Sequence, residues 1–394
     1  MSELPESTRR PLWRRLLRWC GWSIAGVFAL CLLLIAALVL INWHDEPLTP
    51  EAQAWLVVPE NPVPDAENAW LAMQAAVFEV PLEQGVVIAR NRLEFLQRNP
   101  LADMDDVPAL RGVPRTVWQV RFDWCRFDKD ASLASGLMAR EDELLAWLQP
   151  LRPLLARYYA ATTMPGYHQL VSGSPMEPFG ESWELACLAE VDLSLCLMRG
   201  DRSADTQLVQ HLRYGLNGLT QSRTLISSLL AAANVRANNA MLIQLDAAGA
   251  LTPALRAAVL QELQAQAAEP VAAVRQRILQ GELRFSQAMG DLLLQQQRQN
   301  LWEEPSAVET AFWWGASRMR LFQPNASLNF HHQSMLRALQ GEVMPCPTWG
   351  WHNAYNPVGK HLCAAYPANW ESHFQRLDAA AAGLEATIKT LQAH

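Results

Sequence analysis

The sequence has none of the common catalytic signatures. It contains no G-x-S-x-G elbow, no H-E-x-x-H, no P-loop, no S-x-x-K and no G-x-G-x-x-G. At the level of motifs, these absences exclude the serine hydrolases, zinc peptidases and nucleotide-binding enzymes that such patterns define. Any active site has to be sought in isolated side chains.

The chain also lacks an excess of positive charge. Its 32 lysines and arginines are outnumbered by 39 aspartates and glutamates, and the formal net charge is −7. The first twenty residues carry +3, because five arginines there outnumber two glutamates, and residues 21–41 carry none. Residues 42–394 therefore carry −10. Proteins that bind nucleic acid neutralise phosphates with clustered cations, so we expect no nucleic-acid partner.

Charge is absent from one long stretch, Trp22 to Ile41, which reads WSIAGVFALCLLLIAALVLI. A helix of this length rises about 30 Å, which matches the hydrocarbon core of a bilayer. Five arginines precede the stretch, and Asp45 and Glu46 follow it. By the positive-inside rule, the N-terminus is predicted to be cytoplasmic and the rest of the chain to lie outside. We expect residues 22–41 to have the lipid bilayer as their partner.

A cleaved signal peptide is the main alternative for this stretch. The apolar region of a signal peptide has about 7 to 15 residues and ends at a small-x-small site. Here the apolar run is longer, and it closes with the bulky residues LVLINW at 38–43. Both criteria favour an uncleaved signal anchor. A buried core helix is a further alternative, and the arginines on one side argue against it.

The sequence predicts four parts in a bacterial inner-membrane protein. Residues 1–21 form a cytoplasmic basic tail, and residues 22–41 form the transmembrane helix. Residues 42–65 contain five prolines and are expected to be a stiff linker. Residues 66–394 are expected to form one helical domain in the periplasm, which is an oxidising compartment.

The pattern after the linker predicts an all-α fold, an antiparallel helical array. Apolar residues recur three and four positions apart, most clearly in residues 181–299, and short connections there imply antiparallel neighbours. We expect helices at 182–198, 203–219 and 223–246, two more beginning at Pro253 and Pro270, and others at 308–321 and 327–339. The alternation of Trp118, Val120 and Phe122 allows one short strand.

The last predicted helix, residues 370–391, has apolar residues at regular a and d positions. Three heptads are enough for a homodimeric coil. Isolated coils of this length are marginally stable, so a helix docked within the same chain is the preferred interpretation.

Several segments together resemble a known group of proteins. They are PDAENAW at 64–70, LLARYYAATTMPGY at 154–167, LSLCLMRGDRSADTQLVQHLRYGL at 193–216, FQPNASLNF at 322–330 and YNPVGKHL at 355–362. In this order they resemble bacterial inner-membrane proteins of uncharacterised activity that have one N-terminal anchor and a large helical periplasmic domain. The resemblance implies that architecture and no particular site residue.

Cysteines and histidines are concentrated near the C-terminal end. Cys346, His352, His361 and Cys363 are residue types that bind zinc, but their spacing, C-x5-H-x8-H-x-C, matches no common zinc pattern. In an oxidising compartment, a disulfide between Cys346 and Cys363 is preferred over free thiols or a metal site. Closing this 17-residue loop is expected to stabilise the fold by about 3 kcal/mol. No metal and no cofactor are expected.

The predicted binding surface lies in the segments 322–330 and 341–368. Long loops within compact helical domains are often functional. This one contains six candidate binding residues, Trp349, Trp351, His352, Asn356, Lys360 and His361. Residues 356–360 are interpreted as a tight turn with Gly359 in the left-handed conformation. The alternative is that the loop covers the end of the helical array.

Two hypotheses on function follow. The preferred one is a membrane-anchored envelope protein that binds an envelope protein or a glycan through its helical domain. The alternative is an envelope hydrolase acting on cell-wall material, with histidine and carboxylate residues that no motif assigns. A polar strip, Asn234 to Asn239 on an otherwise apolar helix, is expected either to line a groove or to form interhelical hydrogen bonds.

Overall fold

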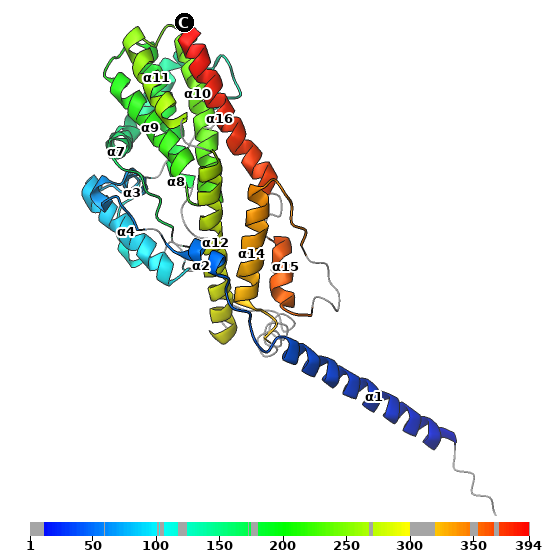
Figure 1. Cartoon of the computed structure of the whole chain (residues 1–394). Helices are drawn as coiled ribbons and strands as arrows, with labels where there is room; N and C mark the ends of the chain where they lie inside the picture. The colour runs from blue at the N-terminus through cyan, green and yellow to red at the C-terminus, as the bar shows by residue number, and fades with distance from the viewer. Residues whose placement is uncertain are drawn as a thin grey trace, which may run out of the picture. The chain divides into compact units, whose positions relative to one another are not determined.

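The computed structural model describes residues 12–58, 60–100, 102, 106–116, 124–171, 173–174, 180–267, 271–299, 320–346, 354–365 and 370–393. These residues are mainly helical and contain no strand, so the all-α prediction is confirmed (Figure 1). Their only β-type pairings are two isolated bridges, Asn68–Gly166 and Phe78–Arg115. The expected strand at 118–122 and the expected helix at 308–321 lie outside the described residues.

The chain separates into two compact units. Unit 2 comprises residues 49–293, 331–344 and 369–394, and unit 1 comprises residues 1–48, 294–330 and 345–368. The single domain expected at 66–394 is thus divided, because segments near its C-terminal end associate with the residues that follow the apolar helix.

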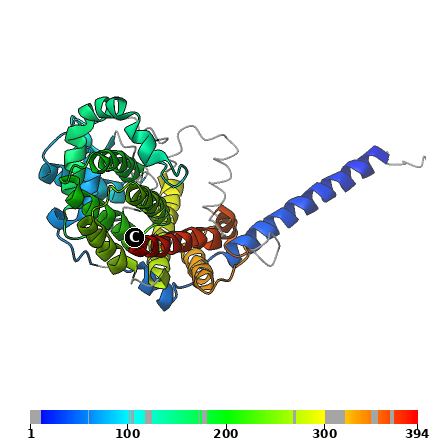
Figure 2. The same cartoon turned by 90° about the horizontal axis from the view of Figure 1, so that it is seen from above.

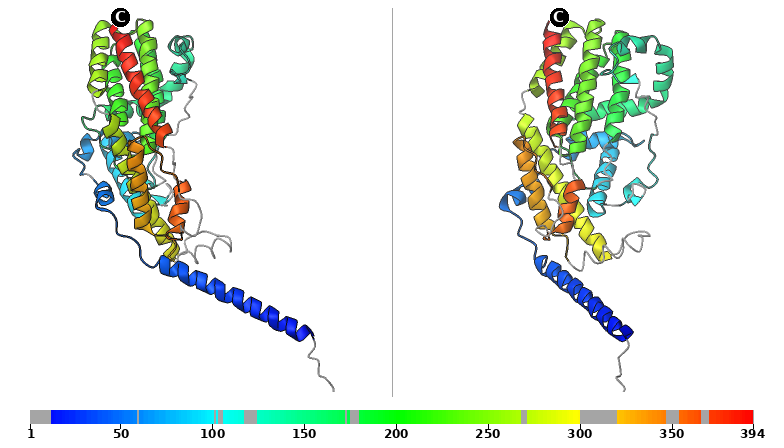
Figure 3. Two further views of the ribbon diagram at one scale, coloured as in Figure 1. Left: turned by 45° about the vertical axis from the view of Figure 1, so that its right-hand side comes forward. Right: turned by 90° about the vertical axis from the view of Figure 1, so that its right-hand side faces the viewer.

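Unit 2 contains the antiparallel helical array. It is formed by α8 (Gly180–Met198), α9 (Ala204–Gln221), α10 (Leu225–Ala247), α11 (Pro253–Ala267) and α16 (Trp370–Ala393). α10 contacts α8, α9 and α16, and α11 contacts α9 and α16. Figure 2 shows these helices from their ends, and both views of Figure 3 show α16 lying along α10.

Capping residues explain where these helices begin and end. Thr224 is the N-cap of α10, and its side chain accepts a hydrogen bond from the backbone N–H of Ser227. Gly249 has a φ of 72° just beyond the C-cap, a conformation that suits glycine. Pro253 then begins α11. The connections are short, as the sequence predicts, and the helix bounds lie close to the expected ones.

The C-terminal helix α16 is docked on its own chain. Its buried residues include Trp370, Phe374, Leu377, Leu384 and Leu391, which occupy the predicted apolar positions. They face α10 and α11 within unit 2. The docked interpretation is confirmed, since the apolar seam is already covered.

Other helices complete unit 2. They are α2 (Pro50–Leu56), α3 (Ala69–Ala75), α4 (Leu82–Arg98), α5 (Leu133–Met138), α6 (Glu141–Leu148) and α7 (Arg152–Thr162), together with α12 (Val271–Gln299) as far as residue 293. α3 packs against α4 and α7. A disulfide that the sequence did not predict joins Cys125 to Cys187 in α8, with 5.3 Å between the Cα atoms. Both cysteines are buried.

Unit 1 begins with the long apolar helix α1 (Leu12–Ile41). Its stretch Leu17–Ile41 is long and apolar enough to cross a membrane, and its apolar window is not buried in the structure. Length and composition alone do not distinguish an anchor from a signal sequence near an N-terminus. The unit also contains the beginning of α14 (Pro324–Leu339) and α15 (Pro357–Ala365). As expected, Cys346 and Cys363 form a disulfide, with 5.8 Å between the Cα atoms.

The tight turn predicted at 356–360 is wrong, because these residues begin α15. Asn356 is the residue with a positive φ, 49°, and Pro357 is the first helical residue. The same Asn-Pro pair that suggests a turn is also an N-cap followed by proline at the first helical position. Gly359 is needed for a different reason from the one predicted, since a Cβ there would collide with Ser327 Oγ and the Asn356 side chain.

Candidate functional site

The predicted binding residues are only partly placed by the structure. Trp349, Trp351 and His352 lie outside the described residues. Asn356, Lys360 and His361 lie at the beginning of α15, in unit 1. Lys360 is half-buried, and desolvation lowers its pKa. Of this set, only Asn356 is the centre of a resolved group of contacts.

Asn356 belongs to a polar group that we call the Asn356 cluster: Asn42, Asp45, Gln323, Ser327 and Asn356. Asn356 Oδ1 accepts hydrogen bonds from the backbone N–H groups of Gln323, at 2.9 Å, and Gly359, at 3.1 Å. Its own N–H donates to Asn42 Oδ1 at 2.8 Å, and its Nδ2 donates to Ser327 Oγ at 2.9 Å. The segments 322–330 and 355–362 of the resemblance therefore meet beside the end of α1.

The residues after α1 are held in the same cluster. Asp45 accepts hydrogen bonds from the first N–H groups of α14, Asn325 at 2.7 Å and Ala326 at 3.1 Å. A carboxylate at this position satisfies orphan donors and complements the helix dipole. Asn42 is fully buried, and its Nδ2 donates to Ala354 O at 2.8 Å. Residues 42–47 thus pack within unit 1, in the stretch that the sequence predicts to be a stiff linker.

The Asn356 cluster has the properties of a structural junction. Each of its five polar side chains has a hydrogen-bond partner within the unit. Buried polar networks whose members satisfy one another rigidify and specify a fold. We therefore looked for a ligand site elsewhere.

A pocket opens in unit 2, between α8, α9 and α10. Its described lining residues are Trp70, Tyr167, Ser182, Trp183, Tyr214, Gly215, Gly218, Ser227, Leu230, Ala231 and Asn234. The pocket holds about 440 Å³, its opening to solvent included. We call these eleven residues the array pocket.

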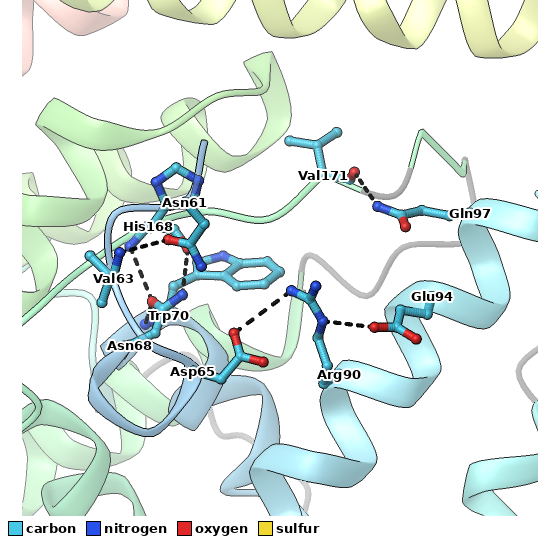
Figure 4. Close-up of polar contacts among 10 residues, drawn as sticks. All are labelled: Asn61, Val63, Asp65, Asn68, Trp70, Arg90, Glu94, Gln97, His168 and Val171. Carbon is cyan, nitrogen blue, oxygen red and sulfur yellow. Dashed lines mark hydrogen bonds and ion pairs between the residues drawn. The ribbon is translucent and has the colours of Figure 1, made fainter. Parts of the chain in front are cut away.

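One buried asparagine fixes two walls of the array pocket. Asn68 is the N-cap of α3, and its Oδ1 accepts from the N–H of Trp70 at 3.1 Å. The same atom accepts from the N–H of His168 at 3.1 Å, while its Nδ2 donates to His168 O at 2.9 Å (Figure 4). These bonds tie the beginning of α3, which contains Trp70, to the segment that contains Tyr167. The two residues are therefore held in fixed positions relative to each other. The segments 64–70 and 154–167 of the resemblance meet here.

The aromatic residues of the array pocket are close together. The rings of Tyr167 and Tyr214 have centroids 5.7 Å apart, in a tilted arrangement. Burial raises the pKa of both hydroxyls, so both phenols are neutral across the physiological pH range. Trp70 is buried and Trp183 is half-buried.

The glycines of α9 make room for the pocket. A Cβ on Gly215 would lie 3.2 Å from Asn238 Nδ2, and a Cβ on Gly218 would lie 3.5 Å from Tyr167 Oη. Gly215 belongs to the segment 193–216, so three of the five resembling segments contribute to this pocket. Sequence analysis did not select Trp70, Tyr167 and Tyr214 as site residues, although each lies in one of these segments.

A neutral hydrogen-bonded chain, Tyr158–His211–Asn238, lies beside the array pocket. His211 Nδ1 is 2.6 Å from the Tyr158 hydroxyl, and His211 Nε2 is 2.7 Å from Asn238 Oδ1. An amide oxygen only accepts, so Nε2 carries the proton and Nδ1 accepts from Tyr158. Burial lowers the pKa of His211 to about 4. Of the polar strip expected on α10, Asn238 forms interhelical hydrogen bonds and Asn234 lines the pocket, so both interpretations apply.

Acid is expected to destabilise the fold through His211. The unfolded chain binds a proton at a pKa near 6.5, and the folded chain near 4, so stability is lost as pH falls between these values. At pH 5 the loss from this residue is about 2 kcal/mol. In the variant His211→Gln, the difference in unfolding free energy between pH 7 and pH 5 should be smaller by this amount, measured by urea denaturation.

Glu190 acts in the opposite direction, because burial raises its pKa, and Tyr158 lies within its electrostatic reach. The contribution of Glu190 is the same in the wild type and in His211→Gln, so it cancels when the pH dependence of their unfolding free energies is compared. An equal pH dependence in the two proteins would contradict the assignment of a neutral His211.

Comparison with family models, curated proteins and solved structures finds no match for the chain. The site must be interpreted from its own geometry.

Proposed function

We propose that the protein is a membrane-anchored binding protein of the bacterial cell envelope. In this proposal α1 is a signal anchor in the inner membrane, with the N-terminus in the cytoplasm and the helical array in the periplasm. The array binds an envelope component, a protein or a glycan. The array pocket is the observation on which the proposal rests.

The distribution of cysteines supports the location. The disulfides Cys125–Cys187 and Cys346–Cys363 both follow the apolar helix, whereas Cys20 and Cys31 within α1 are free. Disulfides form and persist in oxidising compartments such as the periplasm. Together with the arginines before Trp22, they favour export of everything after α1.

The chemistry of the array pocket supports binding over catalysis. None of its eleven described lining residues is a carboxylate, histidine, lysine or arginine. General acid–base catalysis needs such a group within hydrogen-bond reach of the reacting atoms. The alternative, an envelope hydrolase, would have to recruit groups from another part of the chain, such as His352.

Topology gives the first test. Reporters fused after residue 60 should be active only when they are periplasmic enzymes, and a C-terminal fluorescent protein that requires the cytoplasm should stay dark. The mature N-terminus, read by mass spectrometry, should precede Trp22. Fluorescence from the C-terminal fusion would refute the topology, and a mature N-terminus after residue 41 would show a cleaved signal instead.

Crosslinking in cells gives the second test. A photoreactive amino acid at Ala231, which lines the pocket, should form adducts with an envelope component. The matched control is Ala247, an exposed alanine on the same helix α10, and it should form none. Equal labelling at both positions, or none at Ala231, would count against binding through the array pocket.

A further inference from the structure

Three polar groups in the array pocket have no hydrogen-bond partner among the described residues. They are the side-chain amide of Asn234 and the hydroxyls of Tyr167 and Tyr214, whose residues are 7%, 8% and 7% exposed. Within the described part of the chain, no hydrogen bond is made by any of these three groups. None of their polar atoms is among the fully enclosed, unpartnered atoms of the described residues, so each is open to the cavity, and whatever occupies the pocket, water or a ligand, supplies its partner.

We infer that the array pocket binds an uncharged carbohydrate. This inference rests on the proposed binding function and specifies its ligand class. The unpartnered groups are hydroxyls and an amide, and each can both donate and accept. Sugar hydroxyls have the same dual capacity, so a sugar ring can satisfy all three at once.

The aromatic residues fit the other side of a sugar ring. Sugars have faces made of C–H groups, and these pack on aromatic rings. Trp70, Tyr167 and Tyr214 offer such rings in a buried setting, and Trp183 offers one that is half-buried. Asn68 fixes the positions of Trp70 and Tyr167, so little ordering is required when the ligand binds.

The charge and polarity of the lining residues exclude charged ligands and purely apolar ligands. None of the described lining residues carries a charge, and the phenols and the adjacent His211 are neutral. A charged ligand would lose its hydration without a counter-charge. A purely apolar ligand would leave Asn234 and both hydroxyls unsatisfied, which costs free energy for each group.

Gly218 allows the pocket to be filled without breaking the helix. A Cβ there lies at van der Waals distance, 3.4 Å, from Ala231 Cβ and 3.5 Å from Tyr167 Oη, so it packs into the ligand space. Alanine is also a better helix former than glycine, so Gly218→Ala should be at least as stable as the wild type. The matched control is Gly136→Ala in α5, where no atom lies within 4 Å of the new Cβ.

The experiment is calorimetric titration of the full chain in lipid nanodiscs. The probes are the β-1,4-linked disaccharide of N-acetylglucosamine, the same disaccharide with free, positively charged amino groups, and an uncharged peptide with blocked ends. We expect binding of the neutral sugar alone. Gly218→Ala and Asn234→Leu should each weaken it about tenfold or more, the loss of about one hydrogen bond or equivalent contacts. Gly136→Ala should leave it unchanged.

The outcomes separate the ligand class from the binding function. Binding of the charged sugar or the peptide in its place, sensitive to Gly218→Ala, overturns the carbohydrate assignment and leaves the proposed function standing. Sugar binding that Gly218→Ala does not weaken, in a variant that folds normally, overturns the pocket as its site. If no probe binds and Ala231 also captures nothing in cells, both the inference and the proposed function fail.

Discussion

The double variant Cys125→Ser, Cys187→Ser is expected to lower the free energy of unfolding of unit 2 by about 4 kcal/mol. The disulfide closes a loop of 62 residues, and in the chain-entropy model a loop of this length costs the unfolded state about 4 kcal/mol of conformational freedom. It also joins the segment before α5 to α8, which contributes to the array pocket. Urea denaturation followed by circular dichroism measures the change.

The same chain provides a matched control. Cys196 is also in α8, is half-buried and forms no disulfide. The variant Cys196→Ser removes one sulfur and no cross-link, so it should change stability by less than about 1 kcal/mol. A double variant no less stable than this control would show that the disulfide contributes nothing to the native fold.

Replacement of Asn356 by alanine is expected to cost about 3 kcal/mol in unit 1. Three effects add: loss of the N-cap of α15, the strain of alanine at a φ of 49°, and the loss of side-chain partners for the Gln323 N–H and for Ser327 Oγ. The change should appear as faster hydrogen exchange of peptides covering residues 354–365. Exchange in α10 and α16 of unit 2 serves as the internal reference.

The control here is Asn356→Gly. Glycine adopts the positive φ without strain and is a tolerable N-cap, so this variant should lose only the side-chain hydrogen bonds. We expect its effect to be clearly smaller than that of Asn356→Ala. Equal effects of the two variants would mean that the backbone conformation at Asn356 is not a source of stability.

Sequence reasoning succeeded where local patterns decide the structure. The apolar spacing of α16 and the Thr-Pro start of α11 are local, and the structure has both helices near their expected bounds. The pairing of Cys346 with Cys363 is local in the same sense, because only 17 residues separate them in the sequence. The Asn356–Pro357 pair was ambiguous because a turn and a helix N-terminus begin with the same residues.

The array pocket could not be predicted because its lining comes from distant parts of the chain. Trp70, Tyr167 and Asn234 stand on separate segments, and each alone is an ordinary core residue. The disulfide Cys125–Cys187 has the same difficulty, since any of several pairings was open. What the sequence did contain was the group of resembling segments. Three of them meet at this pocket and two at the Asn356 cluster.

The Asn356 cluster has a consequence for the order in which the protein can be made. Asp45 leaves the ribosome 280 residues before Asn325, whose N–H it accepts, and Asn42 precedes Asn356 by 314 residues. Segments so far apart in sequence cannot pair until the later one has been synthesised, and non-local contacts of this kind form slowly. The residues that emerge just after the apolar helix must therefore wait, with their polar groups in water, for nearly the whole chain. Unit 1 is the first part of the protein to begin, and it cannot close until Asn356 has been made.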